Sequence, residues 1–201
     1  AQYGEQAIDI AAGLLDDPNH SSAVRAQAPK ILARIATDHC ADVLCNHLLD
    51  EDIHVRSTSV LGMVSLLRRN HHIHTDREAV GFAIHMEAKG YFELLNLQHN
   101  LELDTETSLL NDALTHRQNQ IVERLLGLLS LKYPSQTIEV VSNNLKSPNV
   151  STRANALEVL DNLLNKEEKS YIIPLLDESP GERKLQTGGE IFQLKNYSRQ
   201  E

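Results

Sequence analysis

The residues best suited to chemistry lie together in one polar stretch in the first half of the chain. The candidates are His71, His72, His74 and Asp76. Imidazole and carboxylate groups are ligands of zinc and nickel, and a loop would allow these side chains to converge on one ion. No second cluster of matching spacing accompanies them. We therefore interpret the stretch as a solvated polar loop and keep metal binding through His71–His74 as an alternative.

Catalytic groups are the next possibility, and the sequence offers few. Cys40 and Cys45 are the only cysteines, and neither has a base at a useful spacing. On a predicted helix they point away from each other, which disfavours a disulfide and favours a reducing compartment. His39 and His47 flank them, but the four side chains point to different sides of that helix and cannot form a tetrahedral site. We therefore predict a protein that is not an enzyme and has no cofactor.

A repeated arginine frame indicates how the chain is organised. The arginines of this frame are Arg25, Arg56, Arg124 and Arg153. Three residues after each stands a small residue, namely Ala28, Ser59, Gly127 and Ala156. Four residues before each stands Ser, Asp, Gln or Asn, of which three are good helix N-caps, and seven residues after each stands Leu or Met. An internal repeat of this kind predicts stacked helix pairs rather than one closed core.

The same frame predicts structural roles for its residues. We expect the small residues to let neighbouring helices approach closely. We expect Arg25, Arg56 and Arg153 to bond carboxylates or carbonyls at the turns beside them. Asn155 and Asp161 lie on one side of a predicted helix. We interpret them as buried structural residues that bond a neighbouring turn, rather than as a binding face.

Hydrophobic periodicity predicts helices along most of the chain. They cover 5–16, a segment from Ser21 kinked at Pro29, 38–49, 52–69, 76–103 as one long helix or as two divided at Gly90, 106–116, 119–132, 135–146, 150–165 and 167–177. Together they predict an all-α fold, a right-handed superhelical solenoid of about five helix pairs over residues 5–178. The arginine spacing widens in the middle, which indicates an irregular unit at 70–104. Residues 179–201 are predicted to be a linker or tail toward an absent domain.

Composition narrows the range of partners. The formal net charge is −9, from 28 acidic residues against 19 Lys and Arg, which disfavours nucleic acid. No apolar run approaches the roughly 18 residues that span a bilayer, and no signal peptide is visible. We therefore expect a cytoplasmic protein that does not itself insert into a membrane. Trp is absent and aromatic residues make up only 4 %, so aliphatic side chains must pack the helices.

The repeat frame resembles HEAT repeats, including the short bacterial type, over about residues 5–178. The resemblance rests on an acidic turn that is followed by a Val-Arg pair. The turn at 15–18 precedes the pair at 24–25, and the turn at 49–52 precedes the pair at 55–56. Residues 153–164 are further similar to the HEAT-like region of bacterial ADP/ATP-carrier-like transporter proteins, which often also carry a cyclic-nucleotide-binding domain. Neither flanking domain lies in this chain, so the resemblance assigns their activities to no residue here.

These features predict a non-catalytic scaffold. We expect a protein-interaction or interdomain module of a larger bacterial protein, and the transporter resemblance implies the cytoplasmic face of a membrane-anchored protein. The expected partners are another protein or neighbouring domains of the same chain. We also expect a fragment with exposed end helices, which would self-associate or fold residues 190–195 back over them. The alternatives are a HEAT-like phycobilin lyase-type protein and the metal-binding module already described.

Overall fold

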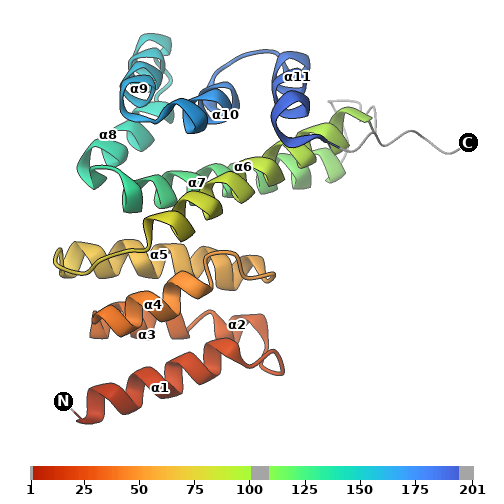
Figure 1. Cartoon of the computed structure of the whole chain (residues 1–201). Helices are drawn as coiled ribbons and strands as arrows, with labels where there is room; N and C mark the ends of the chain where they lie inside the picture. The colour runs from red at the N-terminus through yellow and green to blue at the C-terminus, as the bar shows by residue number, and fades with distance from the viewer. Residues whose placement is uncertain (1, 101–108, 195–201) are drawn as a thin grey trace, which may run out of the picture. The chain divides into compact units, whose positions relative to one another are not determined.

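The computed structural model describes residues 2–100 and 109–194, and every regular element in these ranges is an α-helix (Figure 1). The helices are α1 (Gln2–Asp16), α2 (Ser22–Arg25), α3 (Ala28–Ile35), α4 (Asp38–Asn46), α5 (Ile53–Arg69), α6 (Arg77–Asn100), α7 (Leu109–Lys132), α8 (Ser135–Leu145), α9 (Val150–Leu163), α10 (Lys166–Leu176) and α11 (Gly181–Phe192). Ten of them have eight residues or more, while α2 is a single turn. The predicted all-α class is confirmed. Among the described helices, none is both long and apolar enough to cross a bilayer.

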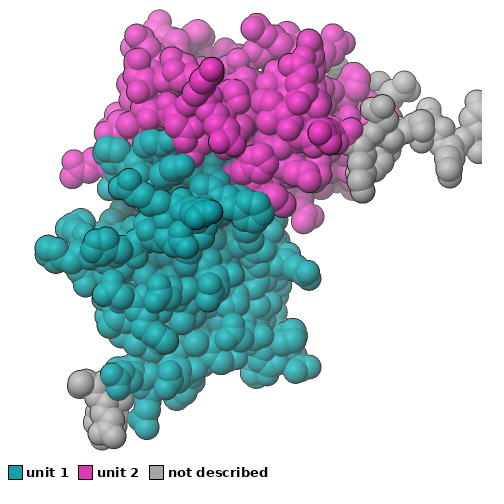
Figure 2. Space-filling view, viewed as in Figure 1, with its two compact units in different colours: residues 1–84, 127–135 teal, residues 85–126, 136–201 magenta. Residues whose placement is uncertain are grey.

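The chain divides into two compact units (Figure 2). Unit 1 contains residues 1–84 and 127–135, and unit 2 contains residues 85–126 and 136–201. Helices α6 and α7 each contribute residues to both units. Unit 1 therefore holds α1 to α5 with the start of α6 and the end of α7, and unit 2 holds the rest of α6 and α7 with α8 to α11.

In unit 1 the helices pack mainly against their neighbours in sequence. Helix α3 contacts α1, α4 and α5, and α4 contacts α5. The largest fully buried side chains of these helices are Leu15, Leu32, Leu44, Met63 and Leu66. Each contributes roughly 1.5–3 kcal/mol by leaving water, so the aliphatic packing predicted from the composition forms the core of the unit.

Two helices begin at the capping residues of the repeat frame. The side chain of Asp52 accepts hydrogen bonds from the N–H groups two and three residues later, at 2.8 and 3.2 Å, and so caps α5. Asn149 caps α9 in the same way, at 2.8 and 3.3 Å. Such caps stabilise a helix by about 1 kcal/mol. Ser21 stands at the N-cap of α2 without a side-chain hydrogen bond to it.

Two features of the helices differ from the sequence predictions, at 117–118 and at Pro29. Helix α7 runs unbroken from residue 109 to 132, because the Arg and Gln at 117–118 are good helix formers and no Gly or Pro interrupts them. Of the two alternatives for 76–103, the single helix is found: α6 continues through Gly90 to residue 100, since one glycine costs only about 1 kcal/mol. Pro29 kinks no helix: it lies in the first turn of α3, where its missing N–H is tolerated. The boundaries predicted between 101 and 108 lie outside the described residues.

The stretch expected to be a linker contains a docked helix, α11, in unit 2. Its Phe192 is buried and packs against the rings of Phe92 and Tyr171, with centroids 5.5 and 5.6 Å away. Gly188 allows this approach, because a Cβ there would lie 2.6 Å from Cδ1 of Phe92. Helix α11 also contacts α10. Residues 190–195 were expected to fold back over an end helix, and Phe192 does so by packing against Tyr171 of α10. Residue 195 lies outside the described residues.

Candidate functional site

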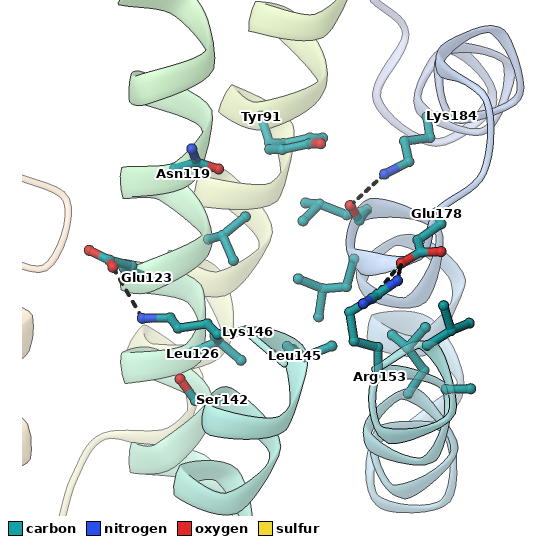
Figure 3. A pocket seen from close by; sticks show the side chains of 16 residues that line it. Tyr91, Asn119, Glu123, Leu126, Ser142, Leu145, Lys146, Arg153, Glu178 and Lys184 are labelled. Carbon is teal, nitrogen blue, oxygen red and sulfur yellow. Dashed lines mark hydrogen bonds and ion pairs between the residues drawn. The ribbon is translucent and has the colours of Figure 1, made fainter. Parts of the chain in front are cut away.

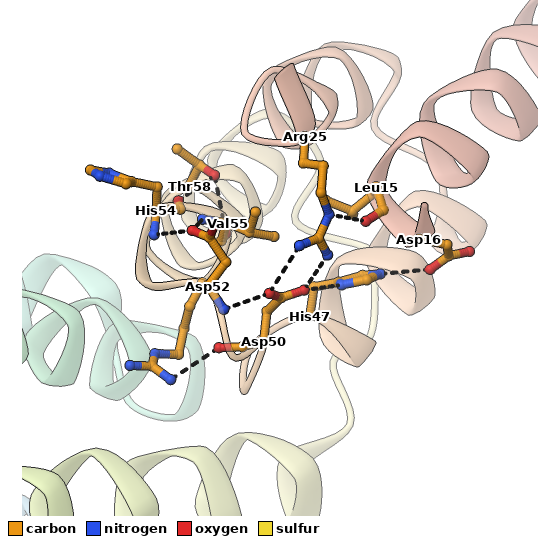
Figure 4. Close-up of polar contacts among 10 residues, drawn as sticks. Leu15, Asp16, Arg25, His47, Asp50, Asp52, His54, Val55 and Thr58 are labelled. Carbon is orange, nitrogen blue, oxygen red and sulfur yellow. Dashed lines mark hydrogen bonds and ion pairs between the residues drawn. The ribbon is translucent and has the colours of Figure 1, made fainter. Parts of the chain in front are cut away.

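In unit 1, Arg25 connects two interhelical turns (Figure 4). Its Nε donates to the Leu15 carbonyl at 2.8 Å, near the end of α1, and its Nη2 donates to Asp50 Oδ2 at 2.7 Å, between α4 and α5. Arg56 lies in α5 and donates from Nη1 to the Asp50 carbonyl at 3.0 Å. The turn contacts predicted for both arginines are therefore present.

In unit 2, Arg153 repeats this arrangement. Its Nη1 donates to the Ser147 carbonyl at 2.8 Å, and its guanidinium forms an ion pair with Glu178. The carbonyl acceptor lies six residues before the arginine, the same separation as for Arg56. The carboxylate lies 25 residues after it, the same separation as for Arg25. The contacts therefore recur with the repeat frame, beyond the recurrence of residue types.

Arg124 departs from this pattern. It lies in the middle of α7, away from any turn, and its Nε and Nη2 donate to the two carboxylate oxygens of Glu87 in α6, at 3.0 and 2.9 Å. Both side chains are only 4 % exposed. A buried, two-pronged pair of this kind fixes how the two helices face each other within unit 2.

The small residues of the frame lie at crowded positions. Full burial is found at Ala28, Ser59 and Ala156. A Cβ added to Gly127 would lie 2.8 Å from Cγ1 of Val60, which is too close for an ordinary contact. At this position α7 and α5 therefore approach closely within unit 1.

The interpretation of Asn155 and Asp161 as buried residues was wrong. Both side chains are exposed on α9, and the Asp161 carboxylate forms an ion pair with Lys169 at 3.0 Å. The buried face of α9 carries Ala156 and Leu160. With about 100° between successive residues, this face points away from both polar positions.

A polar hub that the sequence did not indicate centres on His47. Its Nε2 lies 2.9 Å from Asp16 Oδ1 and its Nδ1 lies 3.0 Å from Asp50 Oδ2 (Figure 4). Burial alone would raise the pKa of Asp50, but hydrogen bonds from His47, the Asp52 backbone N–H and Arg25 together lower it below its ordinary value. Asp50 therefore stays ionised and links the turn between α4 and α5 to Arg25.

The histidine loop of unit 1 is organised differently from a metal centre. Asp76 caps α6, because its Oδ1 accepts hydrogen bonds from the N–H groups two and three residues later, at 2.9 and 3.1 Å. The backbone N–H of His72 donates to Asn70. His71 and His74 line a surface pocket. Within residues 2–100 and 109–194, no three His, Cys, Asp or Glu side chains gather as metal ligands would.

A hollow with a volume of about 710 Å³ lies in unit 2 (Figure 3). We call it the groove. Helices α6 to α11 all contribute to its lining. Its apolar residues are Val122, Leu126, Leu145, Val150, Ala154, Leu157, Leu175 and Leu176. A hollow of this size, walled mainly by aliphatic side chains, is suited to holding apolar groups.

Paired charges stand along the groove. Lys146 Nζ lies 3.3 Å from Glu123 Oε1, and Arg153 pairs with Glu178 (Figure 3). The charges therefore come from α7 and α9 and from the residues just after α8 and α10. Lys184 donates from Nζ to two backbone carbonyls at the end of α10, at 3.0 and 2.8 Å. Burial lowers the pKa of Lys184, although the nearby Asp177 carboxylate opposes the shift.

The groove lacks the arrangement of a catalytic site. Its lining contains no His or Cys, and Ser142 has no histidine beside it to act as a base. Tyr91 also lines it, and burial, with the Asp177 charge, raises the pKa of its phenol, so the hydroxyl stays neutral at neutral pH. These side chains can bind and orient a ligand. The sequence could not reveal the groove, because its lining comes from six helices spread over about 90 residues.

No protein-family model matches the sequence, and comparison with curated proteins and with solved structures finds no significant similarity. The resemblance to HEAT repeats therefore depends on the residues of the repeat frame and on the contacts that they make.

Proposed function

We propose that the chain is a HEAT-like helical repeat that acts as a non-catalytic interaction module of a larger protein. Its binding surface is the groove of unit 2, and its ligand is an apolar helical segment of a partner protein or neighbouring domain. The observation that carries this proposal is the groove itself, with an aliphatic floor and paired charges along its border.

The recurring arginine contacts support the repeat. Arg56 and Arg153 each donate from Nη1 to a turn carbonyl six residues earlier in the chain. Arg25 and Arg153 each bond a carboxylate 25 residues later in the chain. Contacts that recur at fixed separations are expected when one helix-pair unit is repeated along a chain. Sequential packing of the helices in unit 1 agrees with this interpretation.

The chemistry of the groove favours a helix as the ligand. Amphipathic helices bind in hydrophobic grooves by placing side chains at i, i+3, i+4 and i+7 on an apolar floor, while their polar face stays in water. The charges beside the floor form pairs of opposite sign, so the groove repels a ligand charge of neither sign. Val150 lines the groove and is 63 % exposed, so a bound helix would cover it.

The lyase alternative would use the same hollow. A bilin is an extended apolar pigment with two carboxylates, so it needs cations that are available for binding. Two of the three cations in the lining, Lys146 and Arg153, already pair with carboxylates, and the third, Lys184, is bonded to two carbonyls. This arrangement favours a protein segment over a dianionic pigment.

A designed peptide tests the proposal. A fluorescein-labelled amphipathic helix of about 16 residues, with leucines on one face, should bind the protein and protect α7 to α10 from hydrogen exchange. Val150→Asp should weaken binding about tenfold or more, since it puts a charge where about 1–2 kcal/mol of apolar contact forms. Val140→Asp is the matched control, because Val140 is 58 % exposed in the same unit and does not line the groove.

Three outcomes would count against a helix-binding groove. The first is the absence of binding at about 100 µM peptide, because an affinity below that level is too weak for an interaction module. The second is equal loss in the two valine variants. The third is a change in biliverdin absorbance on mixing that Val150→Asp abolishes, which would favour the lyase-type protein instead.

A further inference from the structure

A shallow hollow in unit 1 lies between α3 and α5 and is bordered by cations. Its volume is about 250 Å³. The two helices approach closely there, because a Cβ on Gly62 would lie 3.0 Å from the Pro29 carbonyl oxygen. Lys30 and Arg34 of α3 and Arg69 of α5 line the hollow, and all three side chains are exposed. We call it the basic trough.

No carboxylate lies among the described residues that line the basic trough. Neither α3 nor α5 contains Asp or Glu, although the whole chain has 28 acidic residues against 19 Lys and Arg. The neighbouring helices α1 and α4 contribute no residue to the lining. In α1, Glu5 and Asp9 line a different hollow, and Asp16 lies against His47. The trough is therefore a local region of positive potential on an acidic protein.

The cations of the basic trough are available to a ligand. Within the described part of the chain, the guanidinium groups of Arg34 and Arg69 form no hydrogen bond or ion pair. Lys30 donates at 3.1 Å to the side-chain oxygen of Gln27, a neutral acceptor that leaves its positive charge uncompensated. The two other arginines of α5 already have partners and lie outside the trough. Like charges four residues apart on one helix repel each other, so an anion that joins Lys30 and Arg34 relieves this repulsion.

The cations are spread along the basic trough instead of converging on one point. Lys30 and Arg34 stand four residues apart on α3, about 6 Å along the helix. On α5, Arg69 stands eight residues after Leu61, about 12 Å along the helix. Leu61 also lines the trough and is 66 % exposed, so it offers an apolar contact beside the charges. Separate charges next to an aliphatic side chain suit a chain molecule better than a single small anion.

We propose that the basic trough binds an acidic segment of a partner protein in an extended conformation. Alternate side chains of an extended chain lie on the same side and repeat about every 7 Å, which matches the spacing of Lys30 and Arg34. Guanidinium groups bond carboxylates through two parallel hydrogen bonds, and an apolar residue of the segment packs on Leu61.

A nucleic acid fits the basic trough less well than an acidic protein segment. The net charge of −9 repels a long polyanion. No aromatic side chain among the described residues lines the trough, so it lacks a surface for base stacking. The inference is independent of the groove, because it concerns different residues in a different unit.

Fluorescence anisotropy with a labelled acidic peptide tests the proposal. The probe is a peptide of about 10 residues in which Glu alternates with Ser and one central position holds Leu. It should bind with a Kd on the order of 10–100 µM at about 50 mM NaCl, and at least fivefold more weakly at about 300 mM, because salt screens exposed charges. The double variant Arg34→Gln with Arg69→Gln should weaken binding at least tenfold. Arg117→Gln with Arg183→Gln is the matched control and should change binding less than threefold, since it removes the same charge from exposed arginines outside the trough.

The apolar contact is tested separately. Leu61→Gln should weaken the binding of the peptide about threefold or more, because the leucine of the probe loses its contact. Ile10→Gln is the control and should leave binding unchanged, because Ile10 is 72 % exposed on α1 and does not line the basic trough.

Four results would overturn the proposal. One is the absence of binding at about 1 mM peptide, and another is an equal effect of the two double arginine variants, which would indicate only general charge attraction. A dimer in sedimentation velocity that Arg34→Gln with Arg69→Gln dissociates would assign the basic trough to a second copy of the chain. Tighter binding of a single-stranded oligonucleotide of the same charge would assign it to nucleic acid. Circular dichroism of the variants excludes a folding defect as the cause of lost binding.

Discussion

The buried ion pair of unit 2 gives the sharpest stability test. Glu87 and Arg124 are both only 4 % exposed, and the guanidinium meets both carboxylate oxygens at 3.0 and 2.9 Å. Glu87→Met removes the carboxylate and leaves a charged guanidinium in the interior, which costs about 3–5 kcal/mol. Since domains of this kind are stable by only about 5–15 kcal/mol, the loss should be large and easily measured.

The double variant, with both Glu87→Met and Arg124→Met, is the informative control. Removing both charges also removes the cost of keeping them from water, so methionines of similar volume can fill the site. We expect the free energy of unfolding of the double variant to lie within about 1.5 kcal/mol of the wild-type value. The double variant should therefore be more stable than either single variant. Glu87→Gln keeps the shape and one acceptor, and its loss should be intermediate, about 1–3 kcal/mol.

The assay is urea unfolding followed by far-ultraviolet circular dichroism, with the m-values compared between variants. Unchanged m-values would indicate that every variant exposes a similar surface area on unfolding. Single-variant losses below about 1 kcal/mol would refute the importance of the pair. A double-variant loss equal to the sum of the single losses would show that the two residues act independently.

Two further predictions concern unit 1. Gly127→Leu should destabilise the protein by about 1–3 kcal/mol through overpacking against Val60. Gly13→Leu is the control and should not destabilise it, because no atom lies within 4 Å of the added Cβ. A difference between the two variants below about 0.5 kcal/mol would contradict the close approach at Gly127. The pKa of Asp50 lies below its ordinary value of about 4, so Asp50 contributes stability above that pH, and this stability is lost as the pH falls through the lower, folded pKa. Asp50→Asn should flatten this acid dependence of the unfolding free energy, and parallel curves for the two proteins would disprove its role.

Most helices could be predicted because the signals for them are local. Asp52 and Asn149 cap helices through hydrogen bonds that span only two or three residues, so the residue type at one position was sufficient. The contacts of Arg56 and Arg153 with turn carbonyls span six residues and were also predicted. The error at 117–118, and the question left open at Gly90, arose where the local preference for a break is weak compared with the stability of a long helix.

The sequence by itself thus determined the helical class, the capped starts of α5 and α9 and the arginines that hold the turns, because each depends on neighbours a few residues away. The tertiary structure decided which distant side chains meet. It paired Arg124 with Glu87 across 37 residues, placed His47 between two carboxylates and docked Phe192 against the aromatic side chains of unit 2. The groove belongs to this second kind, since its lining comes from six helices. Its chemistry exists only after packing, because the positions of these side chains depend on how the helices fit together rather than on any spacing along the chain.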